Sequence, residues 1–211
     1  MDFNSVSAFA PVVSKTFDVV FVGRFLKENG VDVLLSSVPL VERMLGRKIL
    51  VGISGDGPEL GHLVHGAYRF GITDSVRFLG SLPSQDEVYR IFKASRIFVC
   101  PQAPEGAWTI ATLEANAAGL PVITSDSNEI GSGREIVLDS VNGSVNGSVI
   151  ASCTAELLPK EIARLLTDGN LLGKLRKSSV EHARQYDGAH VGRDTLELYT
   201  ALLESNRLKR N

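Results

Sequence analysis

The stretch Ile97-Phe-Val-Cys100-Pro-Gln-Ala-Pro-Glu105-Gly-Ala-Trp-Thr-Ile-Ala-Thr-Leu-Glu114-Ala115 joins a short apolar run to a segment of helical character. The apolar run predicts a buried strand, and Gly119-Leu-Pro121 is a helix-ending signal. Glu105 then lies on the turn and Glu114 lies within the helix. The N–H groups at a helix N-terminus have no partners in the helix, and the dipole there is positive, so this end suits a phosphate. The stretch therefore predicts an anion-binding turn bracketed by two carboxylates.

The same alternation of strand and helix patterns continues along the chain and predicts an α/β fold. Right-handed crossovers would give a Rossmann-like, doubly wound parallel sheet, with ligand loops at the carboxyl ends of the strands. The predicted strands are 19–22, 48–54, 76–79, 96–100 and 121–125, with weaker ones at 135–138 and 143–146. The predicted helices are 30–45, 59–70, 85–93, 109–118, 155–167, 171–185 and 188–205.

Composition limits the partners and the compartment. The 211 residues suffice for one domain with a substantial core. The net charge of −2 does not indicate the excess of positive charge that is typical of a nucleic-acid-binding protein. The two cysteines and four histidines have no metal-ligand spacing, so no metal site is expected. No apolar run reaches the ~18 residues of a membrane span, and the expected compartment is the cytoplasm.

Several short segments occur in a characteristic order. They are Phe21-Val-Gly-Arg24 with Gly30-Val31, Val51-Gly-Ile-Ser-Gly-Asp-Gly-Pro58, Val76-Arg-Phe-Leu-Gly80, Pro101 to Gly106, Leu113-Glu-Ala115, Ala118-Gly-Leu-Pro-Val122, Glu135-Ile-Val137 and Asn142-Gly143. In this order they resemble the C-terminal, donor-binding domain of retaining GT-B-type glycosyltransferases of the group 1 class (family 4). The resemblance spans roughly residues 17 to 200.

The resemblance implies a nucleotide-diphosphate sugar as donor and chemistry without a metal or cofactor. Arg24 and Glu105 would be catalytic: Arg24 would stabilise the diphosphate leaving group, and Glu105 would hold a hydroxyl of the donor sugar. Glu114 would hold the ribose hydroxyls. The remaining residues expected at the donor are Gly23, Lys27, Asp56, Trp108, Thr109 and Ile110.

The resemblance also implies a domain organisation. Residues 1–16 would be an irregular, linker-like segment, and residues 17–211 would form the donor-binding domain. The chain would then be half of an enzyme: a fragment, an excised domain or one product of a split gene. The acceptor, and any membrane contact, would belong to an N-terminal domain outside this chain. The C-terminal helix would either pack partly against that domain or be an ordinary terminal helix.

Two departures from the family pattern leave alternatives open. Asn29 stands where the family usually has a lysine, and Lys27 is the nearby substitute. Eight residues separate Glu105 from Glu114, against seven in the family. If the turn does not absorb the extra residue, Glu105 is displaced from the sugar. A non-catalytic nucleotide-sugar-binding or partner subunit is therefore the second hypothesis.

Two further hypotheses fit less well. Gly55-Asp-Gly-Pro58 could open a dinucleotide-binding loop, but the third glycine comes one residue late and the acid that should end the next strand is missing. A sugar-nucleotide epimerase of the same architecture matches the order of the segments less well.

Overall fold

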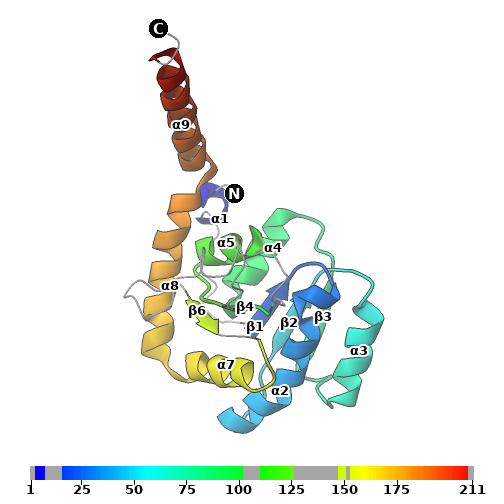
Figure 1. The fold of residues 1–211 in the computed structure, drawn as a ribbon. Coiled ribbons are helices and arrows are strands. Elements are labelled where there is room, and N and C mark those ends of the chain that lie inside the picture. Colours follow the sequence, from blue (N-terminus) through cyan, green and yellow to red (C-terminus); the bar gives the residue numbers. More distant parts are fainter. Residues whose placement is uncertain (1–2, 8–15, 102–109, 126–146, 151–152, 209–211) are drawn as a thin grey trace.

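A computed structural model describes residues 3–7, 16–101, 110–125, 147–150 and 153–208. Its centre is a six-stranded, all-parallel sheet in the order β3-β2-β1-β4-β5-β6 (Figure 1). The strands are β1 (Phe17–Val22), β2 (Val51–Ser54), β3 (Val76–Gly80), β4 (Ser95–Cys100), β5 (Val122–Ser125) and β6 (Gly147–Ile150). The order reverses between β1 and β4, which creates a crevice outside their carboxyl ends. The predicted Rossmann-like fold is confirmed.

The α-helices also follow the predicted pattern, with the exception of the first, α1. They are α1 (Phe3–Ser7), α2 (Val31–Leu45), α3 (Leu60–Arg69), α4 (Gln85–Lys93), α5 (Ile110–Ala117), α7 (Leu157–Thr167), α8 (Gly169–Ala183) and α9 (Gly188–Leu208), with 3-10 turns η1 (Lys27–Asn29) and η3 (Arg184–Tyr186). The weaker predicted strands, 135–138 and 143–146, lie outside the described residues.

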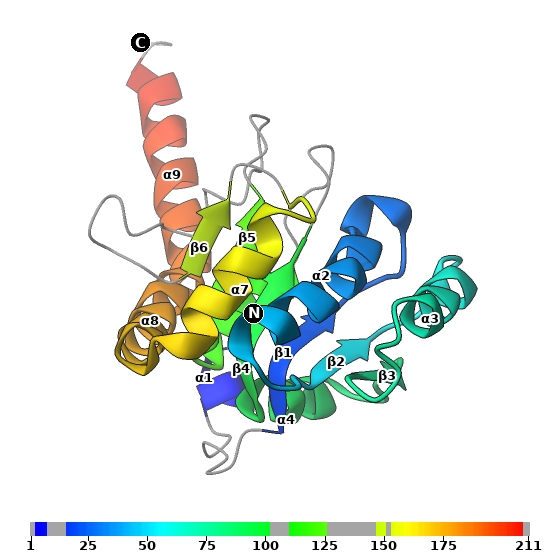
Figure 2. The same cartoon turned by 90° about the horizontal axis from the view of Figure 1, so that it is seen from below.

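Helices cover both faces of the sheet (Figure 2). Because side chains alternate along a strand, successive residues of β1 enter different cores. Val19 and Phe21 pack with α2, α3 and α7, whereas Val20 packs with α4 and α5. Burial on both faces explains why the strands read as unbroken apolar runs.

The N-terminal segment differs from the prediction. Residues 1–16 were expected to be irregular, but Phe3–Ser7 form α1, which packs against α5. Phe3 and Val6 share one face of this turn and are buried in the second core. The Phe3 N–H donates to Asp187 Oδ1 at 3.1 Å, which ties α1 to the start of α9. The domain division at residue 16 stays a prediction.

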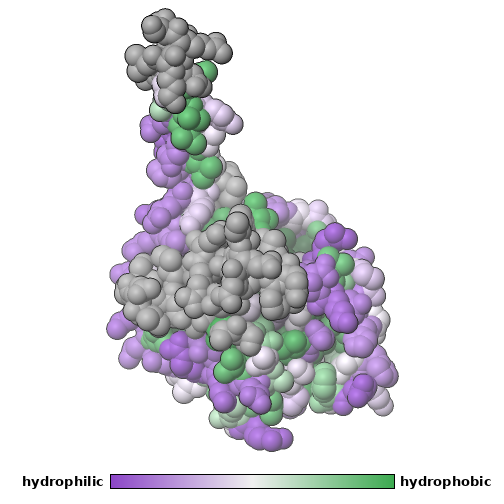
Figure 3. Space-filling view, viewed as in Figure 1, coloured by the Kyte–Doolittle hydropathy of each residue, from purple (hydrophilic) through white to green (hydrophobic). Residues whose placement is uncertain are grey.

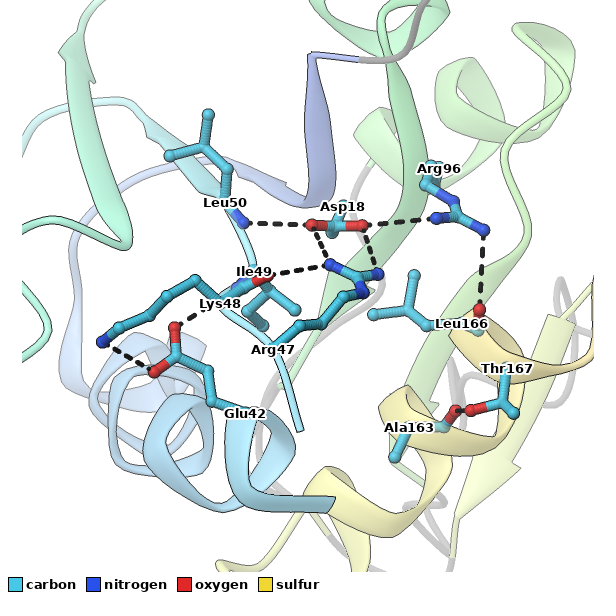
Figure 4. Close-up of polar contacts among 10 residues, drawn as sticks. All are labelled: Asp18, Glu42, Arg47, Lys48, Ile49, Leu50, Arg96, Ala163, Leu166 and Thr167. Atoms are coloured by element: carbon cyan, nitrogen blue, oxygen red, sulfur yellow. Dashed lines mark hydrogen bonds and ion pairs between the residues drawn. The ribbon is translucent and has the colours of Figure 1, made fainter. Parts of the chain in front are cut away.

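A network of charged side chains joins segments near the amino ends of the strands (Figure 4). Asp18 of β1 pairs with Arg47 at 3.0 Å and with Arg96 at 3.4 Å, and it accepts the Leu50 N–H at 3.1 Å. Beside it, burial alone would raise the pKa of Glu42, but hydrogen bonds from Ser75, Lys48 and the Ile49 N–H outweigh burial and lower it. The network links α2 to the strands at the edge opposite the crevice.

Helix α9 projects from the rest of the domain (Figure 1). Leu196, Tyr199 and Leu203 share one helical face and are 67%, 62% and 66% exposed. Apolar side chains are therefore visible along the projecting helix (Figure 3).

Candidate functional site

Three loops at the carboxyl ends of β1, β2 and β3 enclose a cleft of about 530 Å³. Gly23 and Arg24 follow β1, and Gly55 to Gly57 follow β2. Ser81 and Leu82, which follow β3, form the third side. The structure therefore brings the predicted residues Gly23, Arg24 and Asp56 to one cleft, at the edge of the sheet where ligands of α/β folds bind.

Backbone hydrogen bonds hold these loops together. The Gly23 N–H donates to the Ser54 carbonyl at 3.0 Å, and the Gly55 N–H donates to the Gly80 carbonyl at 2.9 Å. Gly55 has φ of +139°, and a Cβ there would lie 1.8 Å from the Gly23 carbonyl oxygen. Only glycine permits this approach. The glycines of the β2 loop thus serve loop packing, a role that the dinucleotide-loop hypothesis did not include.

Asp56 is exposed and shapes its own turn. Its Oδ1 accepts the Gly57 N–H at 2.7 Å, and its carbonyl accepts the Phe25 N–H at 2.8 Å. The predicted place of Asp56 beside a nucleotide stays a prediction.

Arg24 is exposed at the cleft, between the turn at Gly23 and the fully buried Phe25. Asn29 Nδ2 donates to the Arg24 carbonyl at 2.7 Å, across the start of η1. Asn29 therefore restrains the loop that carries Arg24. The exposed Lys27, on the same turn, is not among the described residues that line the cleft.

The β1 loop also touches the start of the β4 loop. Gly30 adopts φ of +64°, ends η1 and begins α2. A Cβ at Gly30 would lie 2.0 Å from the Pro101 carbonyl oxygen. This contact places Arg24 and the stretch that begins at Pro101 on neighbouring loops. Within that stretch, Glu105, Trp108 and Thr109 lie outside the described residues, and their roles stay predictions.

Glu114 is a buried carboxylate, 8% exposed, just over one turn into α5. Gln85 Nε2 donates to its Oε1 at 2.7 Å. Burial raises the pKa of Glu114, although hydrogen bonds from Gln85 and Tyr89 act in the opposite direction. Ile110, the first residue of α5, is 56% exposed.

Sequence reasoning missed Gln85. It is the first residue of α4, directly after Ser84, whose side chain accepts the Glu87 N–H as the helix cap. The available signal was a polar residue at the start of a helix, directly after the loop that follows a strand. Its contact with Glu114 connects α5 to the β3 side of the cleft.

Among the described residues, no three His, Cys, Asp or Glu side chains gather closely enough to hold a metal ion. None of the described helices is both long and apolar enough to cross a membrane.

The family model for the glycosyl transferases group 1 matches residues 5–186. The chain belongs to this family. It is 28% identical over 201 residues to the D-inositol 3-phosphate glycosyltransferase of Salinispora tropica. The matched region covers 90% of this chain and 39% of that protein. This group 1 glycosyl transferase chain thus spans less than half the length of that relative.

Solved structures show the same fold. The C-terminal domain of a group 1 family glycosyl transferase (LpcC) from Francisella tularensis matches with a TM-score of 0.72 at 17% identity, over 88% of this chain and 97% of that one. HepE from Anabaena, crystallised with UDP and glucose, matches with a TM-score of 0.76 at 19% identity, over 95% of this chain and 55% of that one. The fold is therefore that of the C-terminal, Rossmann-like half of a GT-B glycosyltransferase.

Proposed function

We propose that this chain is the donor-binding half of a retaining glycosyltransferase and that its cleft binds the diphosphate of a nucleotide-diphosphate sugar. The observation that carries the proposal is the exposed Arg24 at the carboxyl end of β1, in a cleft whose other walls are loops after β2 and β3. A guanidinium group can donate two parallel hydrogen bonds to phosphate oxygens. The UDP in the HepE crystal supports this ligand class.

The chemistry assigned to these residues is electrostatic. When the glycosidic bond to the diphosphate breaks, negative charge grows on the leaving group, and a fixed cation beside it lowers the barrier. Arg24 supplies that cation, and the Asn29 bond to its carbonyl limits the movement of its loop. The proposal requires no metal, since the charge is met by Arg24 and by the N-terminus of α5.

Glu114 is proposed to accept hydrogen bonds from the two ribose hydroxyls. Its carboxylate is held by Gln85, so its orientation is set before the ligand arrives. Glu105 is proposed to hold a hydroxyl of the donor sugar. The acceptor substrate would be bound by a partner domain.

The exposed face of α9 suits such a partner. Leu196, Tyr199 and Leu203 expose apolar area that a domain–domain contact would bury. We propose that this face packs against the acceptor-binding half. Co-expression of the two halves tests this: Leu203→Glu should weaken their co-purification, whereas Glu197→Gln, on the same helix, should not.

A non-catalytic donor-binding subunit is the second candidate, and the Asn29 contact favours it. The amide occupies the family's lysine position and is already engaged by the Arg24 carbonyl, so this position contributes no charge to a diphosphate. Measurement of donor hydrolysis after addition of an acceptor-binding half separates the two candidates: turnover supports the enzyme, and binding without turnover supports the subunit.

Calorimetric titration with UDP and GDP tests the cleft itself. Arg24→Ala should weaken binding about tenfold or more, since hydrogen bonds to charged groups contribute about 1.5–3 kcal/mol. Arg43→Ala is the matched control, because it removes the same charge from an exposed position at the end of α2. Equal affinities in the wild type and Arg24→Ala would contradict the proposal.

A further inference from the structure

A second cavity, of about 440 Å³, lies on the side of the sheet where the strands begin, opposite the cleft at Arg24. It is formed by the C-terminal ends of α4 and α5 and by one side of α8. Lys93 and Gly119, on its walls, precede the amino ends of β4 and β5, whereas the cleft at Arg24 lies beyond carboxyl ends. We call this cavity the α8 pocket. It belongs to neither the donor cleft nor the projecting face of α9.

The walls of the α8 pocket carry an excess of positive charge. Its charged residues are Lys93, Arg176, Lys177, Arg184 and a single carboxylate, Glu181. Cations often stabilise helix C-termini, which explains Lys93 at the end of α4 and Arg184 at the end of α8. Arg176 and Lys177 lie in the middle of α8, where that explanation fails.

Arg176 is the central cation. Its Nη2 donates to the Ser95 carbonyl at 3.0 Å, but its Nε is buried and has no hydrogen-bond partner in the described structure. Burial lowers the pKa of Arg176, and repulsion from Arg96 lowers it further. An arginine nevertheless remains protonated in proteins. No carboxylate in the described part of the chain lies within ion-pair distance of it, so the pocket wall contains a guanidinium charge without a carboxylate partner and with one unsatisfied N–H.

The shape of the pocket leaves room for a ligand. Glycines occupy two wall positions. Apart from its chain neighbours and its own helix backbone, no described atom lies within 4 Å of a Cβ built at Gly173, whereas a Cβ at Gly119 would lie 3.4 Å from Val180 Cγ2. Lys177 is exposed and able to turn toward the opening. Arg184 lies 5.4 Å over the Phe3 ring, which restrains its guanidinium group at the rim.

We propose that the α8 pocket binds a phosphate group, with Arg176, Lys177 and Arg184 as donors. Three cations match the double charge of a phosphate better than the single charge of a carboxylate. A guanidinium group can donate two parallel hydrogen bonds to phosphate oxygens, and an ammonium group can donate a single one. The cavity falls within the range of small-molecule sites and exceeds a bare phosphate, so the group belongs to a phosphate ester. The proposal does not depend on the function of the donor cleft.

Titration with inorganic phosphate, followed by backbone amide NMR, tests the site. Sodium chloride at equal ionic strength is the control for general charge effects. The Gly119 and Gly173 amides should shift in a saturable way, and they report on the α8 pocket independently of Gly23 and Gly55 in the cleft. If only the cleft amides shift, or if chloride gives the same shifts, the proposal is overturned.

Variants then identify the donors. Lys177→Gln changes an exposed side chain and should weaken phosphate binding at Gly119 about tenfold. Lys174→Gln, also exposed on α8 but outside the pocket, should leave it unchanged. Arg176→Gln should abolish the shifts; if that variant does not fold, Lys177→Gln and Arg184→Gln decide. Unchanged binding in both of these would overturn the proposal.

Two probes distinguish the source of the phosphate. Glycerol 3-phosphate represents a soluble ester, and phosphatidylcholine vesicles containing phosphatidic acid represent a lipid headgroup. Binding of glycerol 3-phosphate that is tighter than that of inorganic phosphate, without sedimentation on vesicles, identifies a soluble ester. Sedimentation that Lys177→Gln abolishes identifies a headgroup. If neither ester binds, the assignment to a phosphate ester is wrong.

Discussion

Replacing Gly55 with alanine is expected to separate the loops that form the cleft. A Cβ at this position would lie 1.8 Å from the Gly23 carbonyl oxygen and 3.2 Å from Phe25 Cε1. The first atom is backbone, so no rotamer change relieves the overlap. The loop after β2 must move away from the loop that carries Arg24.

The size of the effect follows from two contributions. At φ of +139° an alanine is strained, which costs about 1–3 kcal/mol. Displacing a packed neighbour costs about 1–3 kcal/mol more. For a domain of this size each kcal/mol lowers Tm by about 2–4 °C, so we expect a fall of about 10 °C. UDP affinity should fall as well, because Arg24 moves with its loop.

Thermal unfolding by circular dichroism and calorimetric titration measure the two effects, and two other glycines provide matched controls. Gly46→Ala shares a positive φ, +64°, but apart from its chain neighbours no described atom would lie within 4 Å of its Cβ, so it should cost only about 1–2 kcal/mol. Gly61→Ala lies in α3 in open space and should be neutral or slightly stabilising. If Gly55→Ala melts and binds like Gly46→Ala, the close approach of the two loops does not determine the site.

Glu114→Gln should weaken UDP binding, and its stability relative to the wild type should rise as the pH increases above the ordinary carboxyl pKa of 4.5. Burial raises the pKa of the Glu114 carboxyl in the folded protein, so the wild type loses stability as the pH rises from 4.5 through the folded-state pKa. The glutamine amide does not ionise and avoids this loss. A difference in Tm that does not change with pH would contradict the prediction. Asn29→Lys should tighten UDP binding about tenfold at low salt, since a charge at ~4 Å contributes up to ~4 kcal/mol before desolvation. The same variant should lose about 1 kcal/mol of stability, because the hydrogen bond from Asn29 to the Arg24 carbonyl is lost. If Lys27 already fills that role, Lys27→Ala is the damaging change instead; unchanged dissociation constants in both variants would place this loop away from the phosphates. Asp18→Ala should lower stability by about 1–2 kcal/mol, because two arginines lose their carboxylate, and 1 M salt should shrink the difference measured by urea unfolding.

Local signals in the sequence determined the order and type of most elements, although α1 and β6 were not predicted. Apolar runs and Gly or Pro punctuation located the strands, because parallel strands are buried on both faces and tolerate few polar residues. The predicted helix 85–93 has the same ends as α4 in the structure, where Ser84 caps its first turn. The placement of Gly23 and Arg24 in the cleft followed from their position directly after a strand, since the carboxyl ends of parallel strands lie on one side of the sheet.

The tertiary structure decided which side chains meet. Gln85 and Glu114 are 29 residues apart, and their contact depends on how α4 and α5 pack on the sheet. The approach of Gly55 to Gly23 depends on the parallel pairing of β1 with β2, and α1 forms where α5 offers it an apolar surface. The same packing collects Arg176 and Lys93 from separate helices into the α8 pocket. Such contacts leave no local pattern, because the free energy that selects them comes from burial and pairing between segments that only the folded chain brings together.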